Sequence, residues 1–350
     1  MPTPTPSVRT DGPELEFDFP GLLIGVAEYE EGPTGLTVFY FPQGVMAAVD
    51  VRGGAAATIN TDRLRLGYDQ PTVRAIFFTG GSSYGLEAAS GIMAELLAMR
   101  GNATPSTPAG ATTAPAGGPV AWEMIPTVTG AVVFDFRGRD NPIYPDKQLG
   151  RAALQGARAG RFALGARGAG RMVNVGKFFG PAFMESAGQG GAFRQAGPTK
   201  VAAFTVVNSV GVIVDRAGRV VRGNLDPETG LRSTLAADLN DGSAVRKKRA
   251  RAAPEPVPLS PGGGNTTLTV LVTSQQLTHP QLSRLAVQTH TSMARAIQPF
   301  HTEKDGDVLF AVTTGEARNP DLEFEELAAH AAEAAWDAVL SAVPGTKKAR

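Results

Sequence analysis

The sequence predicts an α/β fold in which β-strands pair in the centre and helices cover them, as in a layered sandwich. Two observations carry this prediction. Short runs rich in β-branched and aromatic residues dominate the middle of the 350-residue chain. Three longer segments, residues 86–100, 280–297 and 322–343, repeat apolar residues at helical spacing. No internal repeat is visible, which excludes solenoid and propeller architectures.

The first expected strands form a pair. Residues 35–41 and 45–51 are β-rich runs separated by Pro42-Gln43-Gly44, a sequence typical of a turn, so we expect an antiparallel hairpin. A buried strand at residues 73–78 then leads through a glycine-rich turn into the first helix. The remaining expected elements are strands at residues 131–136, 201–207, 210–215, 266–274 and 308–314 and a short helix after Pro145.

Three segments have the composition of loops or linkers. Residues 1–15 contain too little apolar surface to repay ordering, so we expect a flexible N-terminal arm. Residues 101–119 are rich in Pro, Gly, Thr and Ala, which predicts an exposed insertion loop. Residues 238–264 are polar and contain the basic run 246–251, which we interpret as a solvated charge cluster in a flexible linker.

The overall composition excludes several classes of protein. The chain has 33 Lys and Arg against 33 Asp and Glu, and a protein without net charge creates no field that attracts nucleic acid. It has no cysteine, which excludes disulfides, thiol nucleophiles and cysteine-ligated metals. Residues 1–20 lack the apolar core of a secretion signal, and no window approaches the length of a membrane span. We therefore expect a soluble, cytoplasmic protein that binds neither nucleic acid nor membranes.

Motifs for phosphate and metal binding are incomplete. Gly176-Lys177 resembles part of a phosphate-binding loop, but Arg171 and Phe178 stand where that loop needs Gly and Ser or Thr. Residues 305–307 (DGD) lack the spacing and the distal Glu of a calcium loop and are simply interpreted as an Asp-Gly turn. We expect no metal and no cofactor, because zinc-binding spacing is also absent around the histidines, His279, His290, His301 and His330.

One candidate nucleophile lies in the glycine-rich turn. Residues 81–85 (GSSYG) match the G-x-S-x-G motif between a predicted strand and a predicted helix, the context of a hydrolase nucleophile elbow. Ser83 would then need a histidine base, and His290 or His301 follows it in the chain. A glycine-rich turn of this kind also arises in α/β proteins without such chemistry, and the antiparallel strands elsewhere do not suit that hydrolase fold.

A second candidate nucleophile follows three glycines. Residues 262–267 read GGGNTT, so a flexible backbone leads into a strand that begins with a hydroxyl residue. If the Thr266 hydroxyl attacks the carbonyl of Asn265, an N→O acyl shift followed by hydrolysis cuts the chain. The freed α-amine of Thr266, with a reference pKa of about 7.7–8.0, is then a base for its own hydroxyl. The alternative interpretation is an ordinary Gly-rich turn before a Thr-rich strand.

Several blocks in one order resemble a known family. They are residues 80–89 (GGSSYGLEAA), 144–147 (YPDK), 210–224 (VGVIVDRAGRVVRGN), 264–273 (GNTTLTVLVT) and 297–314 (IQPFHTEKDGDVLFAVTT). Together they are similar to the self-processing N-terminal-nucleophile hydrolases that include L-aminopeptidase/D-esterases and β-peptidyl aminopeptidases. Within that family the chain looks most similar to the nylon-oligomer hydrolases, which cut 6-aminohexanoate oligomers internally. Threonine at position 266 favours that branch, because the aminopeptidase branch has serine there.

The resemblance implies a set of site residues. It places the cut between Asn265 and Thr266 and surrounds the nucleophile with five side chains. Lysine would hold positive charge near the nucleophile, asparagine would donate to the oxyanion, and the two aspartates would orient the amine and hydroxyl and titrate as a coupled pair. The tyrosine would contact the substrate or the leaving amine, and Ser83 would lie in a wall of the pocket. These five residues are Tyr144, Lys177, Asn208, Asp305 and Asp307.

The resemblance also implies an architecture and an activity. It implies a four-layer αββα sandwich whose precursor is cut into a large chain, residues 16–265, and a small chain, residues 266–350, that remain together. The processed protomers would form a homo-oligomer, expected to be a tetramer of heterodimers. The expected activity is amide hydrolysis of an oligoamide. Aminopeptidase or esterase activity within the same family and a serine esterase based on Ser83 are the alternatives.

Overall fold

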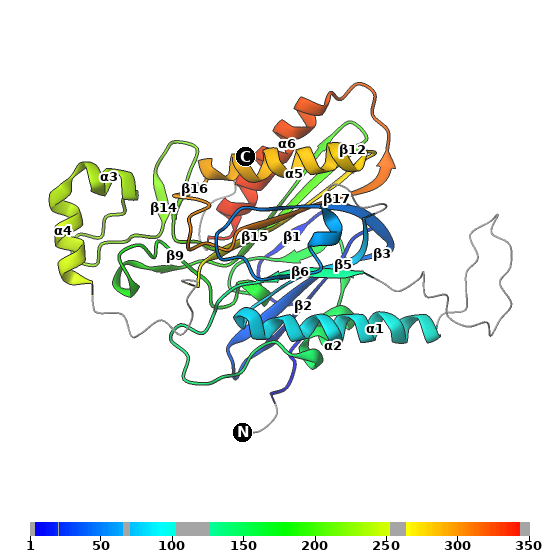
Figure 1. Cartoon of the computed structure of the whole chain (residues 1–350), viewed down its shortest axis with the longest axis horizontal. Helices are drawn as coiled ribbons and strands as arrows, with labels where there is room; N and C mark the ends of the chain where they lie inside the picture. Colours follow the sequence, from blue (N-terminus) through cyan, green and yellow to red (C-terminus); the bar gives the residue numbers. More distant parts are fainter. Residues whose placement is uncertain (1–3, 20, 66–70, 103–126, 253–263, 344–350) are drawn as a thin grey trace, which may run out of the picture.

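Two pairs of helices enclose the strands. The computed structural model describes residues 4–19, 21–65, 71–102, 127–252 and 264–343. Helices α1 (Ala88–Asn102) and α2 (Lys147–Gln155) cover one side, and α5 (His279–Ser292) and α6 (Phe324–Ser341) cover the other (Figure 1). Strands fill the space between the two helix pairs. The expected αββα order of layers is therefore confirmed. Of the insertion loop predicted at 101–119, the first two residues belong to α1 and residues 103–119 lie outside the described residues.

The strands form two layers that share one long strand. One layer contains β2 (Leu23–Tyr29), β5 (Thr72–Thr79), β6 (Val128–Val132) and the first half of β3 (Thr34–Val51). The other contains β11 (Gln189–Ala196), β12 (Thr199–Asn208), β15 (Thr266–Gln275), β17 (Val308–Ala317) and the second half of β3. The pairs β5–β6 and β15–β17 are parallel, whereas the other pairs in these layers are antiparallel.

Shorter elements surround the two layers. They are β1 (Glu14–Glu16), β4 (Thr58–Ile59), β7 (Arg158–Ala159), β8 (Arg161–Ala163), β9 (Asn174–Val175), β10 (Glu185–Ser186), β13 (Val212–Val214), β14 (Val220–Arg222), β16 (Ile297–Gln298), α3 (Leu235–Asn240) and α4 (Gly242–Arg251). Strands β13, β14 and β16 form a separate small sheet. The helical spacing that extends to Ile297 in the sequence ends earlier as an α-helix, because a 3₁₀ turn at Met293–Arg295 leads from α5 into β16.

The predicted hairpin at residues 35–51 is wrong. These residues form the single strand β3, and Pro42-Gln43-Gly44 lies at a bulge where the pairing with β5 shifts register. Before the bulge β3 pairs with β2, and after it β3 pairs with β17. A bulge bends a strand without reversing it. The turn-forming residues Pro42, Gln43 and Gly44 therefore lie where β3 bends from the first strand layer into the second.

Alternate residues of β3 and β5 face opposite sides of their strand layer. In β3 and β5, Val38 and Phe77 pack toward α1 and α2, whereas Phe39 and Phe78 join the larger core that includes the second layer. Phe204 of β12 lies at the centre of that core, with its ring centroid 4.9 Å from Phe162 and 5.5 Å from Phe39. These tilted aromatic contacts hold the two strand layers face to face.

The predicted flexible linker is partly wrong. Residues 235–251 form α3 and α4, and the side chain of Asp241 caps α4 by accepting from the backbone N–H groups of Ser243 and Ala244. The basic run is not uniformly solvated, because Lys248 is 4% exposed and donates to Asp238 at 2.9 Å. Arg251 pairs with Asp226 at 2.9 Å. Residues 253–263 of the expected linker lie outside the described residues.

The described part of the N-terminal segment packs against the sandwich. Ser7 pairs with Glu28 of β2, and β1 pairs antiparallel with β8. The segment expected to be a flexible arm therefore makes backbone contacts from residue 7 onward. Within the ranges given above, no helix is long and apolar enough to cross a membrane.

Replacing Phe204 by alanine tests the face-to-face packing of the layers. Phe204 is fully buried and contacts the rings of Phe17, Phe39 and Phe162. We expect Phe204→Ala to lower the free energy of unfolding by about 3–5 kcal/mol, measured by urea denaturation, because it removes a core ring and leaves a cavity. Leu97→Ala on the exposed face of α1 is the control, with an expected change within about 0.5 kcal/mol. Equal changes for both variants would contradict this packing.

Candidate active site

The ends of three central strands meet at Thr266. Thr266 is the first residue of β15 and pairs with Asn208, the last residue of β12. On the other side of β15, Leu268 pairs in parallel with Val308, the first residue of β17. The residues just before β17 therefore lie beside the start of β15, as the bridge between Asn265 and Asp305 shows. Strand register alone brings together segments that are far apart in the sequence.

The peptide between Asn265 and Thr266 is held on both sides. The Thr266 hydroxyl oxygen lies 2.5 Å from the carbonyl oxygen of Asn265, and the backbone N–H of Gly306 donates to the same carbonyl oxygen at 2.8 Å. Thr266 and Asn265 are only 6% and 5% exposed. A hydroxyl thus lies against the carbonyl group that precedes it, and a backbone amide is already bonded to the oxygen that would become negative on attack.

Lys177 and Asn208 hold the preceding carbonyl group of the chain, that of Gly264. The carbonyl oxygen of Gly264 accepts from Lys177 Nζ at 3.2 Å and from Asn208 Nδ2 at 3.0 Å. Lys177 also donates to the side-chain and backbone oxygens of Asn208, at 2.6 and 2.8 Å. Both residues therefore lie beside Gly264, and neither donates to the carbonyl oxygen of Asn265, the position at which Asn208 was expected to donate.

The surroundings of Lys177 oppose its positive charge. Burial, with a smaller contribution from the nearby Arg137, lowers the pKa of Lys177 to about 7, although Asp305 acts in the other direction. Its three oxygen acceptors match the three N–H donors of an ammonium group. The three acceptors therefore bond to the charged form of Lys177, and the pKa of this ammonium group lies in the neutral range.

The two aspartates are fully buried and have different partners. Asp305 accepts from the backbone N–H of Val210 at 3.0 Å and from the backbone N–H and hydroxyl of Thr302. Asp307 accepts from the backbone N–H of Thr267 at 2.7 Å. Burial, and then the neighbouring carboxylate of Asp307, raise the pKa of Asp305 to about 6.

A pair of histidines extends this carboxylate cluster. Nδ1 of His301 lies 3.0 Å from Asp307, and Nδ1 of His290 lies 2.9 Å from Asp50. The two imidazole rings contact each other edge to face, with centroids 4.2 Å apart. Burial lowers the pKa of His290, which keeps that ring neutral at physiological pH. The sequence suggested these histidines as bases for Ser83 but not as zinc ligands, and it did not associate them with the aspartates.

Ser83 is not joined to either histidine. It is exposed in the 3₁₀ helix Ser82–Glu87, and among the described residues no hydrogen bond connects its hydroxyl to an imidazole. Both histidines are paired with the carboxylates of Asp50 and Asp307. The arrangement needed for a Ser83 nucleophile is therefore not formed.

Tyr144 lies farther from the Asn265–Thr266 peptide. Its hydroxyl donates to Glu87 at 2.9 Å, and its ring centroid lies 5.7 Å from that of Tyr84. Phe136 and Phe134 continue from Tyr84 toward Gly264. Tyr144 is thus connected to Gly264 by a series of aromatic ring contacts and not by a hydrogen bond.

The backbone of Gly306 is the group that sequence reasoning missed. The motif DGD predicts functional roles for its two aspartates. The glycine between them supplies the backbone amide that donates to the carbonyl oxygen of Asn265. A methyl group at Gly306 would lie 2.7 Å from the Thr266 hydroxyl oxygen. The absence of a side chain at position 306 therefore leaves the room that this hydroxyl occupies.

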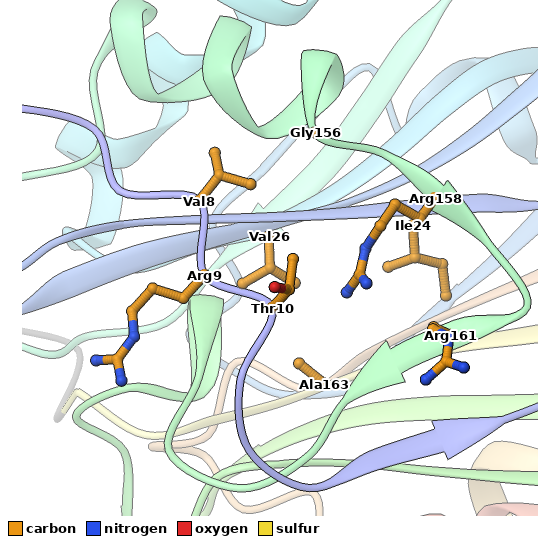
Figure 2. A pocket seen from close by; sticks show the side chains of 9 residues that line it. All are labelled: Val8, Arg9, Thr10, Ile24, Val26, Gly156, Arg158, Arg161 and Ala163. Atoms are coloured by element: carbon orange, nitrogen blue, oxygen red, sulfur yellow. The ribbon is translucent and has the colours of Figure 1, made fainter.

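A separate hollow lies beside the N-terminal segment (Figure 2). Arg158 and Arg161 line it, and both are bonded to Glu14, at 2.6 and 3.1 Å. Arg9 is bonded to Asp11 at 2.6 Å. Because these guanidinium groups have carboxylate partners, the hollow has no ready site for an anion. It shares no residue with the Thr266 cluster, and across the described segments no three His, Asp or Glu side chains are arranged to hold a metal.

Comparison with known proteins identifies the family of the chain. The model of "Peptidase family S58" matches residues 17–349. The chain belongs to peptidase family S58. The expected family resemblance is therefore confirmed over nearly the whole chain.

Individual S58 relatives and a solved structure refine the comparison. The chain is 42% identical to a 6-aminohexanoate-oligomer endohydrolase of Paenarthrobacter ureafaciens and 43% identical to one of Agromyces sp. (strain KY5R). Each alignment covers 96% of this chain and 88% of the relative. The L-aminopeptidase D-Ala-esterase/amidase of Ochrobactrum anthropi, described as a variant of the Ntn hydrolase fold, matches with a TM-score of 0.63 at 16% identity, over 97% of this chain and 91% of that one. The fold of this S58 member is thus an N-terminal-nucleophile hydrolase fold.

Adding a methyl group at Gly306 tests the role of the space beside Thr266. We expect Gly306→Ala to displace the hydroxyl and to slow any reaction of Thr266 with the Asn265 carbonyl by about 100-fold, since misplacement by about 1 Å has that effect. Intact mass of the chain over time after synthesis measures the reaction. Gly242→Ala is the matched control, because a methyl group there meets nothing within 4 Å. Equal rates in the Gly306 and Gly242 variants would contradict the assignment.

Proposed function

We propose that the chain is a self-processing amide hydrolase that cuts 6-aminohexanoate oligomers internally, with Thr266 as its nucleophile. The observation that carries the proposal is the position of the Thr266 hydroxyl, 2.5 Å from the carbonyl oxygen of Asn265, with the Gly306 N–H on that oxygen. Thr266 would become the N-terminus of a small chain, residues 266–350, and residues 16–265 would belong to the large chain.

Self-processing would begin in the uncut chain. The Thr266 hydroxyl oxygen attacks the Asn265 carbonyl carbon, and the Gly306 N–H stabilises the oxyanion. The C–N bond breaks, the nitrogen takes up the hydroxyl proton, and an ester joins Asn265 to the Thr266 oxygen. Water then hydrolyses the ester, which leaves a carboxylate on Asn265 and a free α-amine on Thr266. Asp307 fixes the start of β15 during these steps through its bond to the Thr267 N–H.

The same groups would then act on a substrate amide. The free α-amine of Thr266 takes the hydroxyl proton as the oxygen attacks the substrate carbonyl, and the departing amine receives that proton. The acyl group stays on the Thr266 oxygen until water releases it. The positive charge of Lys177 favours the neutral form of the α-amine, which is the form that acts as a base. Asn208 orients Lys177 through two short hydrogen bonds.

The two relatives described above support the oligoamide substrate. Both are named 6-aminohexanoate-oligomer endohydrolases, and their alignments include Thr266 and its surroundings because they cover 96% of the chain. We also propose that processed protomers assemble into a cytoplasmic homo-oligomer, a tetramer of heterodimers, as the family resemblance implies. Light scattering of the purified protein measures the assembly, and a mass of one protomer would contradict it.

Activity of nucleophile variants on linear 6-aminohexanoate oligomers tests the proposed function. We expect the rate of oligomer hydrolysis to fall to the assay background in Thr266→Ala. Thr266→Ser should retain hydrolysis, because only serine supplies a replacement hydroxyl. Ser83→Ala is the control and should hydrolyse the oligomers at the wild-type rate. Products separated by chromatography give the rates. Loss of activity in Ser83→Ala with activity retained in Thr266→Ala would contradict the proposal.

The pH dependence of self-processing tests the charges around Thr266. In the uncut chain, protonated Lys177 holds the carbonyl of Gly264 and ionised Asp305 holds the segment before β17 through Val210 and Thr302. The rate of self-processing should therefore rise as the pH increases through about 6 and fall as the pH increases through about 7. Lys177→Arg keeps a positive charge at every pH in this range and should remove the decline above pH 7. Gel analysis of chain freshly made by cell-free synthesis gives the rates. An unchanged alkaline decline in Lys177→Arg would show that another group titrates there.

A further inference from the structure

Four aromatic rings form a continuous row from Gly264, the residue before Asn265, to the surface. The aromatic row consists of Phe134, Phe136, Tyr84 and Tyr144. Successive ring centroids are 5.7 Å apart from Phe134 to Phe136, 6.4 Å from Phe136 to Tyr84 and 5.7 Å from Tyr84 to Tyr144. Phe134 and Phe136 are half-buried, whereas Tyr84 is 68% exposed. No part of the catalytic scheme above uses this row.

The inner end of the aromatic row contacts Gly264, the residue before Asn265. The backbone of Gly264 lies so close to the Phe134 ring that a methyl group on Gly264 would be 2.7 Å from Cδ1. The carbonyl oxygen of Phe134 accepts from Asn208 Nδ2 at 3.2 Å, and the same nitrogen donates to Gly264. The row therefore begins beside the acyl side of the Asn265–Thr266 peptide.

The alternating sequence FDF holds the row in place. In the extended segment after β6, Phe134 and Phe136 contact each other, and Asp135 between them is buried. Asp135 accepts from the backbone N–H of Gly81 at 2.8 Å and pairs with Arg139 at 3.0 Å. The guanidinium of Arg139 also lies over the Phe136 ring, 4.2 Å from its centroid. These contacts fix Phe136 and the start of the turn that carries Tyr84, so the row is preorganised.

In the uncut chain, Gly264 and Asn265 occupy the place of the acyl part of a substrate. A substrate carbonyl that reaches Thr266 must take the position of the Asn265 carbonyl, because the nucleophile and the Gly306 N–H converge there. The atoms that precede this carbonyl then follow the path of Asn265 and Gly264, along Phe134. The precursor thereby indicates the direction in which the acyl side of a substrate leaves the nucleophile.

We propose that Phe136, Tyr84 and Tyr144 bind the second monomer unit on the acyl side of a polymethylene oligoamide. The inference rests on the proposed function, since it names a subsite for that substrate class. The first unit contacts Phe134, and the second passes over the outer three rings. Polymethylene segments have no hydrogen-bonding groups between their amides, so aromatic rings suit them better than polar side chains do.

The length of the substrate agrees with this placement. A 6-aminohexanoyl unit has seven backbone bonds against three in an α-amino acid, so it is about 8 Å long when extended, scaled from about 3.4 Å per residue in a strand. The first unit therefore ends beyond Gly264. The two centroid steps of 5.7 and 6.4 Å from Phe134 to Tyr84 place the outer rings beside the second unit.

Comparing oligomers of different length tests the subsite. The linear dimer of 6-aminohexanoate places one unit on the acyl side, whereas the tetramer can place two there. We expect Tyr84→Ala to lower the ratio of kcat/KM for the tetramer to that for the dimer about ten-fold, and Tyr84→Phe to keep the wild-type ratio because the ring remains. Leu231→Ala is the matched control, since Leu231 is a 70% exposed apolar side chain outside the aromatic row.

The outcomes distinguish the subsite from the proposed function. A wild-type protein that cuts neither dimer nor tetramer would overturn the proposed function and the subsite with it. A wild-type protein that cuts both, with a ratio in Tyr84→Ala equal to that in Leu231→Ala, would overturn the subsite alone. A changed assembly mass of Tyr84→Ala by light scattering, with an unchanged ratio, would identify the outer rings as a contact between protomers and would also overturn the subsite.

Discussion

The position of the Asn265 carbonyl oxygen is the constraint on which the rest of the site depends. The Gly306 N–H and the Thr266 hydroxyl both bond to it, and this requires the segment before β17 to lie beside the start of β15. Parallel pairing of β15 and β17 sets that position, and the packing of the two strand layers around Phe204 maintains it. The site therefore needs the whole sandwich, even though its reacting atoms belong to two adjacent residues.

Such a site carries an electrostatic cost that its hydrogen bonds offset. Two carboxylates and an ammonium group are removed from water, and isolated buried charges would each cost several kcal/mol. Both oxygens of Asp305 and of Asp307 accept hydrogen bonds from N–H or hydroxyl donors, and Lys177 donates to three oxygens. The remaining imbalance appears as the raised pKa of Asp305 and the lowered pKa of Lys177. Buried groups that titrate near neutral pH are typical of catalytic clusters.

The sequence predicted elements with strong local patterns and missed features that depend on tertiary contacts. The helices α1, α5 and α6 and the central strands follow from periodicity, and the family resemblance brought Thr266, Lys177, Asn208, Asp305 and Asp307 together. The continuous strand β3 was missed because a Pro-Gln-Gly run suits both a turn and a bulge, and only pairing with two layers decides between them. The helix α4 was missed because its buried Lys248 looks like a solvated charge until Asp238 is placed beside it. The Gly306 amide and the His290–His301 contact have no local signal, since a backbone donor and a ring contact carry no sequence pattern.

Intact mass and N-terminal sequencing of the purified protein beside Thr266→Ala test the central claim most directly. The account predicts two chains in the wild type, with the smaller one beginning Thr-Thr-Leu, containing 85 residues and having a mass of about 9 kDa when scaled from 36.4 kDa for the whole chain. It predicts one uncut chain for Thr266→Ala. A wild-type protein that remains a single chain of 350 residues and still hydrolyses amides would contradict it.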